Sequence, residues 1–125
     1  MDENGLSKVI IGAAIEVHRF LGPGLLENVY RQCLAQELGL LGIRVAQEVP
    51  ISASYKGADV DLAYRLDMLV ADRVVVELKV VEQLQKIHEA QLLSYLRLSG
   101  KRLGLLINFN VTQLRGGIRR VVNGL

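Results

Sequence analysis

The residues best suited to chemistry gather in one short segment of this chain. Asp67, Glu77 and Lys79 lie within two apolar runs, 66–71 and 74–81, which a short polar turn separates. β-branched residues dominate the second run, so the pattern predicts a β-hairpin. Runs that are apolar on both faces are typical of buried strands. A buried, unpaired carboxylate is costly, so we expect something to compensate these charges.

The length of the turn decides whether the two carboxylates meet. If the turn holds the three residues 71–73, Val70 pairs with Val74 and Asp67 lies directly opposite Glu77. A two-residue turn would place the two acids on opposite faces of the sheet. We therefore predict the three-residue turn, or a bulge that restores the same parity.

Two carboxylates and an ammonium group would then converge. Lys79 shares the face of Glu77, because strand side chains alternate. Neighbouring carboxylates raise each other's pKa unless a cation lies between them, and a hard divalent ion such as Mg²⁺ prefers such oxygen ligands. Lys79 would then be a point charge beside a metal-bound water or a phosphate. The alternative is a structural Glu77–Lys79 ion pair, with Asp67 at the end of a strand.

Length and composition bound the class of protein. The 125 residues suffice for one domain with one core, spanning residues 1–125, and half of them are hydrophobic. No apolar run approaches the ~20 residues that a membrane helix needs, and the polar, acidic N-terminus does not resemble a signal peptide. Cys33 is the single cysteine, which excludes an internal disulfide and a cysteine-rich zinc site. We expect a cytoplasmic protein whose net charge of +2 permits a nucleic-acid partner without requiring one.

The hydrophobic pattern predicts the element order α-α-β-β-β-α-β-α. Apolar spacing predicts helices over about 7–21, 25–41 and 83–98, strands over 43–54, 60–71, 73–81 and 103–109, and a final short helix over 113–122. The first three strands can form a meander. The long helix after them is then a right-handed crossover that places the last strand in parallel.

Side chains outside the hairpin could complete a site. Glu27 opens the second helix and His18 lies near the end of the first; each position suits its charge electrostatically, and each residue could instead bind a metal. Gln91 and Tyr95 share one face of the crossover helix, where they form either its solvent edge or a contact to phosphate or base. Arg119 and its basic neighbours near the C-terminal end either contact phosphates or form a solvated basic face.

The segment 24–30, Gly-Leu-Leu-Glu-Asn-Val-Tyr, resembles the signature of the GxxExxY protein family. The segments 76–79, 88–96 and 104–109 also look like that family, in the same order, and the likeness spans about residues 4–123. The family is grouped with the PD-(D/E)XK nuclease superfamily. The resemblance therefore implies a restriction-endonuclease-like, three-layer α/β/α fold with a mixed central sheet.

The resemblance also implies roles for particular residues. Asp67 would be the metal-binding aspartate of the superfamily, and Glu77 and Lys79 its E-x-K pair. Glu27 is similar to a helix carboxylate that some members add to the site, and His18 to an accessory histidine.

Further positions would contact nucleic acid. Gln91 and Tyr95 look like the Q-x-x-x-Y element of the recombination-exonuclease branch, and we add Tyr30 and Arg119 as contacts. One departure from the superfamily pattern is Leu66, which replaces the usual proline before the motif aspartate.

Together these inferences predict a Mg²⁺- or Mn²⁺-dependent nuclease that hydrolyses phosphodiester bonds in DNA rather than RNA. The alternative is a non-catalytic nucleic-acid-binding or assembly module that retains the fold. Charged residues at every site position argue against the alternative, because a dead site is free to replace buried charges with apolar residues. Specific DNA interfaces bury on the order of 1,000 Å² or more of protein surface, so a homodimer or a protein partner would help so small a domain to grip its substrate.

Overall fold

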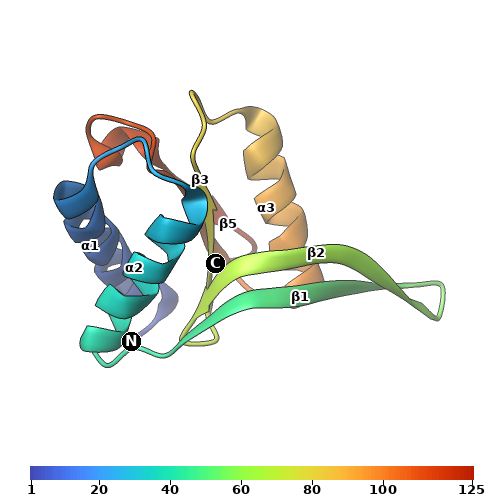
Figure 1. Ribbon diagram of the computed structural model, residues 1–125. Helices are drawn as coiled ribbons and strands as arrows, with labels where there is room; N and C mark the ends of the chain where they lie inside the picture. The colour runs from blue at the N-terminus through green and yellow to red at the C-terminus, as the bar shows by residue number, and fades with distance from the viewer.

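The computed structural model, which describes residues 1–125, has a mixed β-sheet between two layers of helices (Figure 1). Helices α1 (Glu3–Leu21) and α2 (Glu27–Leu40) pack on one face of the sheet, and α3 (Lys86–Ser99) packs on the other. None of these helices combines the length and the apolar character required to cross a bilayer. The predicted three-layer α/β/α arrangement is therefore confirmed.

The five strands lie across the sheet in the order in which they occur along the chain. They are β1 (Val45–Tyr55), β2 (Ala58–Val70), β3 (Val74–Lys79), β4 (Leu103–Asn108) and β5 (Ile118–Val122). Only β3 and β4 pair in parallel, joined through α3, whereas the other neighbours are antiparallel. The predicted meander and the predicted crossover are both present.

The end of the chain differs from the prediction. The predicted helix over 113–122 is wrong: a short 3₁₀ helix, η1 (Leu114–Gly117), leads into strand β5. Gly117 lies so close to β4 that a Cβ atom there would meet the carbonyl oxygen of Asn108 at 2.3 Å, which permits only glycine. The β-branched residues after it suit a strand, and pairing with β4 satisfies what would otherwise be an exposed sheet edge.

The turn between β2 and β3 contains three residues, as predicted. Val70 pairs with Val74, and the amide of Arg73 donates to the carbonyl of Val70 at 3.0 Å. Ala71 and Asp72 both adopt positive φ, at 51° and 57°. The odd number of turn residues sets the parity of the hairpin and therefore the face on which each later side chain lies.

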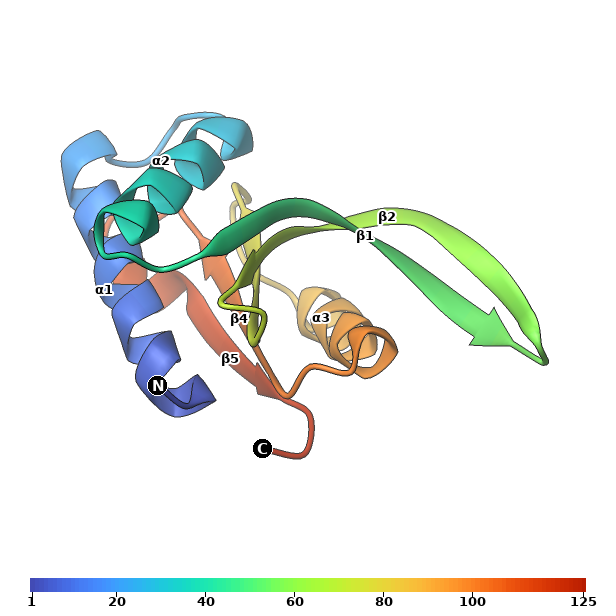
Figure 2. The ribbon, with the colours of Figure 1, turned by 90° about the horizontal axis from the view of Figure 1, so that it is seen from below.

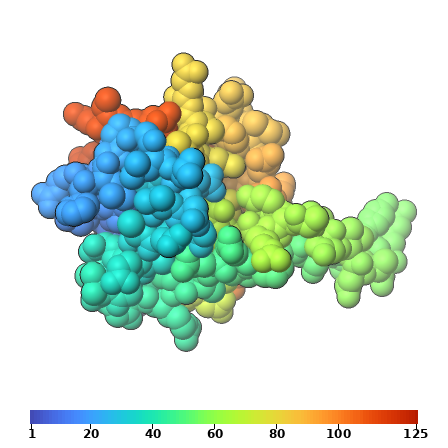
Figure 3. Space-filling model, in the orientation of Figure 1, coloured from blue at the N-terminus to red at the C-terminus, as the bar shows by residue number.

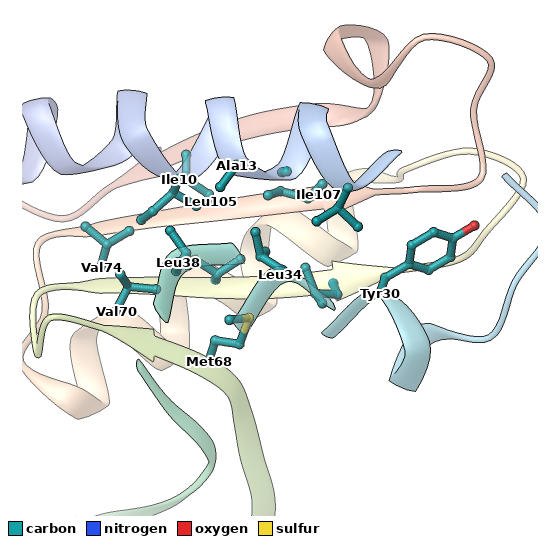
Figure 4. Packing of buried hydrophobic residues seen from close by; sticks show 14 of the residues in the cluster. Ile10, Ala13, Tyr30, Leu34, Leu38, Met68, Val70, Val74, Leu105 and Ile107 are labelled. Carbon is teal, nitrogen blue, oxygen red and sulfur yellow. The ribbon is translucent and has the colours of Figure 1, made fainter. Parts of the chain in front are cut away.

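Two separate cores stabilise the two faces of the sheet. The larger contains 18 buried residues, most of them from α1, α2 and the sheet. Figure 4 shows Leu38 of α2 beside Val70 and Val74, and Leu34 between Leu38 and Tyr30 along the same helix. The smaller contains 7 buried residues, including Leu92 and others from α3 and the sheet. In β3 the residues alternate between these two cores, so both faces of the strand are covered.

The outer part of the β1–β2 hairpin projects away from the rest of the molecule (Figures 2 and 3). Its residues from Ser52 to Asp61 are almost all exposed. The pairing register shifts after Ile51, because Leu62 and Ala63 of β2 have no partners on β1. The inner part of β2, which follows this irregularity, carries the predicted site.

Candidate active site

The two carboxylates of the hairpin lie side by side, as the turn length predicted. The ladder between β2 and β3 ends with the pair Met68 and Val76, and Asp67 and Glu77 are the next residues along each strand. Beyond this point, side chains replace the backbone ladder. The amide of Asp67 donates to Glu77 Oε1 at 3.2 Å, and the amide of Leu78 donates to Asp67 Oδ2 at 2.7 Å.

This opening of the ladder explains how the chain tolerates two acids in a sheet. Backbone amides that lose their strand partners need acceptors, and here each carboxylate provides one for the opposite strand. Such bonds from backbone N–H groups to carboxylates are stronger than bonds between neutral groups. The two strands therefore stay joined through the acids themselves.

Burial leaves the acid pair short of positive charge. Glu77 is only 2% exposed, and burial, followed by the charge of Asp67, raises the pKa of Glu77 to about 8. Burial also raises the pKa of Asp67, although the bond from the Leu78 amide and the charge of Lys79 partly oppose the rise. The pair therefore favours either a shared proton or a cation.

Lys79, the last residue of β3, is the cation with the largest effect on the two acids. Its charge lowers the pKa of Asp67, Glu77 and Glu27, yet it takes part in none of the three ion pairs shorter than 4.0 Å. Its carbonyl accepts a hydrogen bond from the amide of Phe109 at 3.0 Å, which fixes the backbone at the end of the strand. The ammonium group is thus close to the acids but not held by them.

Glu27 approaches the pair from the start of α2. Partial burial, followed by the charge of Asp67, raises the pKa of Glu27, whereas the charges of Lys79 and Arg31 lower it. Arg31, one helical turn further along α2, donates to Gln47 Oε1 at 2.6 Å and thereby connects the helix to β1. Helix α2 therefore brings both a carboxylate and a guanidinium group to the same electrostatic environment.

Two stacked tyrosines border the acid pair on the side of α3. The hydroxyl of Tyr64 donates to Glu77 Oε2 at 2.7 Å, and its ring stacks on that of Tyr95 with centroids 4.4 Å apart. Burial, followed by the charge of Glu77, raises the pKa of Tyr64, which keeps this hydroxyl protonated and able to donate. Tyr95 therefore lies next to the site, in contact with a site residue.

The carboxylate pair suits a hard divalent cation. No group of three or more histidine, cysteine, aspartate or glutamate side chains is close enough to hold a metal ion. Mg²⁺, however, usually takes only one or two protein carboxylates and keeps water or substrate phosphate as its other ligands. The amide of Leu78 donates to Asp67 Oδ2, so Oδ1 is the oxygen that Asp67 can share with Glu77 through a proton or offer to a cation.

Two predicted site residues have structural contacts inside the molecule. His18, proposed as a metal ligand, is 7% exposed, and its Nε2–H donates to the carbonyl of Val111 at 2.8 Å, which joins α1 to the segment before η1. Tyr30, proposed as a nucleic-acid contact, is fully buried; its ring stacks on Phe109 with centroids 4.4 Å apart and its hydroxyl donates to the carbonyl of Gly22. The full burial of Tyr30 leaves no surface for a nucleic acid, so that prediction is wrong, whereas the metal role of His18 stays a prediction.

The other two predicted contacts are exposed, and their roles stay predictions. Gln91 is exposed on α3, four residues before Tyr95. Arg119 pairs across the sheet with Leu106, which in turn pairs with Glu77. Cross-strand partners share a face, so Arg119 lies on the face of the acids, about 10 Å away at the usual strand spacing.

Three residues near the site were missed from the sequence. They are Tyr64, Arg31 and Asn108. Asn108 is buried at the end of β4 and binds the backbone of Val81 through both its amide nitrogen and its oxygen. Asn108 thus fixes the chain just after Lys79. Two of these residues had a local signal in the sequence. Arg31 follows Glu27 by four residues, and Asn108 is the single polar residue at the end of an apolar run. No local pattern marked Tyr64.

Comparison with known proteins agrees with this geometry. Residues 4–121, nearly the whole chain, match the family model described as the PD-(D/E)XK nuclease superfamily. The chain belongs to this superfamily. PD-(D/E)XK nucleases generally use divalent metal ions, which fits the paired carboxylates.

A solved structure has a similar fold. The crystal structure of SSO0001 superposes with a TM-score of 0.55 at 20% sequence identity, over 79% of this chain. The chain spans about half of that protein, 51% of its length, so the likeness concerns the fold alone. Among curated proteins no match was found. The restriction-endonuclease-like fold of a PD-(D/E)XK protein is therefore established for this chain.

Proposed function

We propose that this protein is a Mg²⁺- or Mn²⁺-dependent nuclease that hydrolyses phosphodiester bonds in DNA. The observation that carries the proposal is the contact between Asp67 and Glu77, two buried acids from neighbouring strands, with Lys79 on the same side. Burial raises the pKa of both acids, and perturbed pKa values of this kind cluster at functional sites, which supports a catalytic role for the pair. Membership of a nuclease superfamily supports phosphodiester hydrolysis as the reaction at these acids.

Each residue of the proposed site has a distinct task. Asp67 and Glu77 would hold the cation, and Glu27, which does not form a three-residue metal cluster with them, would add negative charge on the side of α2. Bound there, a divalent ion supplies an activated water and neutralises charge that develops on the phosphate. Lys79 would orient the attacking water and stabilise negative charge on the phosphate through its free ammonium group.

The strand itself would be held by residues around the acids. Gln91 and Tyr95 on α3 and Arg119 on β5 are the proposed contacts. Arg119, whose Nη1 donates to the carbonyls of Gly116 and Ile118, would bind a phosphate about 10 Å from the acids. Phosphate contacts of this kind position the strand without reading its sequence. We therefore propose little intrinsic sequence preference.

Within the superfamily we propose the GxxExxY family, on the strength of residues 24–30. We further propose that residues 1–125 act as a single nuclease-like domain, as a homodimer or with a protein partner. The proposed location is the cytoplasm, where a lone free thiol such as Cys33 stays reduced.

Cleavage of labelled DNA tests the proposal. Purified protein is incubated with single- and double-stranded DNA in Mg²⁺, in Mn²⁺ and in chelator, beside the variants Asp67→Asn and Lys79→Ala. The matched controls are Asp59→Asn and Lys56→Ala, because both residues are exposed on the projecting hairpin. We expect cleavage that requires the metal, is lost in both site variants and is retained in both controls.

Two other outcomes would contradict the proposal. Metal-dependent binding of DNA without cleavage would instead support a non-catalytic module that retains the fold. Equal cleavage by the wild type and by Asp67→Asn would point to a contaminating nuclease and remove the support for this site.

A further inference from the structure

We propose that Tyr64 is a positioning residue of this centre: its hydroxyl fixes the orientation of Glu77, and stacking on Tyr95 fixes Tyr64. The inference rests on the proposed nuclease function, since it concerns the residue that prepares Glu77 to bind a cation. It assigns Tyr95 a structural task beside any contact with the DNA strand.

Two hydrogen bonds fix the orientation of the Glu77 carboxylate. Its two carboxylate oxygens have different partners: Oε1 accepts from the amide of Asp67 at 3.2 Å, and Oε2 accepts from the hydroxyl of Tyr64 at 2.7 Å. The shorter bond holds Oε2 on the side of α3 and so leaves Oε1 beside Asp67. Without Tyr64, rotation of the Glu77 carboxyl group would be restrained by the longer bond alone.

The fold brings Tyr64 to this position through an irregularity in β2. Leu62 and Ala63 have no partners on β1, and Ala63 adopts a positive φ of 52°. Asp61 Oδ1 accepts from the amide of Ala63 at 2.8 Å, which stabilises this conformation. Two inserted residues preserve the alternation of side chains but increase the local bend of the strand, directly before Tyr64. Such irregularities commonly re-aim a side chain next to an active site.

Tyr95 restrains the ring that carries this hydroxyl. The rings of Tyr64 and Tyr95 lie 4.4 Å apart at their centroids with an interplanar angle of 21°. Offset stacking of this kind contributes about 1 kcal/mol beyond burial. Tyr95 is anchored on α3, whose Leu92 and Leu96 are buried in the smaller core. The orientation of Glu77 is therefore connected to α3 through two aromatic rings.

Outer partners of this kind affect metal binding. A hydrogen-bond partner that orients a metal ligand typically changes metal affinity by about 10- to 100-fold when it is removed. We therefore expect Tyr64→Phe, which keeps the ring and deletes the hydroxyl, to weaken Mn²⁺ binding by about tenfold. Tyr95→Ala, which removes the ring stacked on Tyr64, should also weaken Mn²⁺ binding.

Calorimetric titration with Mn²⁺ alone, well below the melting temperature of each variant, measures this effect without substrate. Tyr55→Phe is the matched control, since it deletes the hydroxyl of an exposed tyrosine at the tip of the hairpin. Thermal unfolding with and without Mn²⁺ provides a second measurement, because a ligand stabilises the folded state according to its affinity. We expect Tyr64→Phe to lose most of the Mn²⁺-induced rise in Tm.

The outcomes separate this inference from the proposed function. Mn²⁺ affinity in Tyr64→Phe equal to that of the wild type and of Tyr55→Phe would overturn the role of Tyr64 and leave the nuclease proposal intact. A lower Tm in Tyr64→Phe with unchanged Mn²⁺ affinity would show a packing role only and would also overturn it. Absence of Mn²⁺ binding and of DNA cleavage in the wild type would overturn both.

Discussion

The two faces of the sheet divide stability and chemistry between them. The face under α1 and α2 carries 18 buried hydrophobic residues. The face under α3 carries only 7, and Glu77 lies on that face, bonded to Tyr64, which packs against this smaller core. Buried acids with raised pKa values destabilise the folded state at neutral pH. The comparison teaches that most of the buried apolar side chains lie on one face of the sheet, whereas Glu77 and its partner Tyr64 lie on the other.

Strand β3 shows this division residue by residue. Val74, Val76 and Leu78 belong to the larger core, whereas Val75 belongs to the smaller one and Glu77 follows it on the same face. A change on one face should therefore alter catalysis, and a change on the other should alter stability.

The largest effect is expected from Glu77→Gln. Loss of this carboxylate removes a proposed metal ligand, so DNA cleavage in Mg²⁺ should fall by about 10³-fold, which corresponds to about 4 kcal/mol in the activation barrier. The free energy of unfolding in metal-free buffer at neutral pH should not fall, since an uncharged amide is easier to bury. Single-turnover cleavage and urea denaturation measure the two quantities, and a variant that cleaves normally would break the comparison.

A core substitution on the other face should show the opposite pattern. Leu34→Ala removes a fully buried side chain between α2 and the sheet and should reduce the free energy of unfolding by about 3 kcal/mol. Activity per folded molecule should change little. Leu40→Ala, at a side chain that is 72% exposed, is the matched control in urea denaturation. A loss of activity in Leu34→Ala without loss of stability would contradict the division.

The pH dependence of stability should report on the acid pair. The folded-state pKa of Glu77 is about 8, above its ordinary value of 4.5, so the folded state binds its proton more tightly than the unfolded chain does. The contribution of this residue to the stability of the metal-free protein should therefore be fully present below about pH 4.5 and should be lost progressively as the pH rises through about 8.

The free energy of unfolding, measured by urea denaturation at a series of values between about pH 4 and about pH 9, would test this dependence. Glu77→Gln should flatten the slope of stability with pH, and saturating Mg²⁺ should do so in the wild type, because a bound cation keeps the carboxylate ionised. An equally steep slope in Glu77→Gln would assign the effect to other groups.

The smallest effect is expected from Tyr30→Phe. This variant deletes the hydroxyl that bonds to the carbonyl of Gly22 but keeps the ring stacked on Phe109. The free energy of unfolding should fall by about 1 kcal/mol, whereas DNA affinity should not change. Filter binding beside thermal unfolding distinguishes the two, and a weaker DNA complex with unchanged stability would restore Tyr30 as a nucleic-acid contact.

The sequence by itself determined the parts of this protein that depend on short-range geometry. Alternation along the strands and the three-residue turn were sufficient to predict that Asp67 would lie opposite Glu77, because the two strands are joined directly and their register follows from the turn. The same holds for the two N-terminal helices and the crossover through α3, whose patterns are strong.

Only the tertiary structure decided which residues that are far apart in the sequence come into contact. His18 and Val111 are 93 residues apart, and no local pattern indicates that their contact uses the imidazole. Strand β5 forms because the edge of β4 offers it partners, against a helical spacing of its arginines. The position of Tyr64 depends on two unpaired residues in β2 and on a ring from α3. Side chains far apart in sequence compete for the same buried partners, and only packing of the whole chain selects among them.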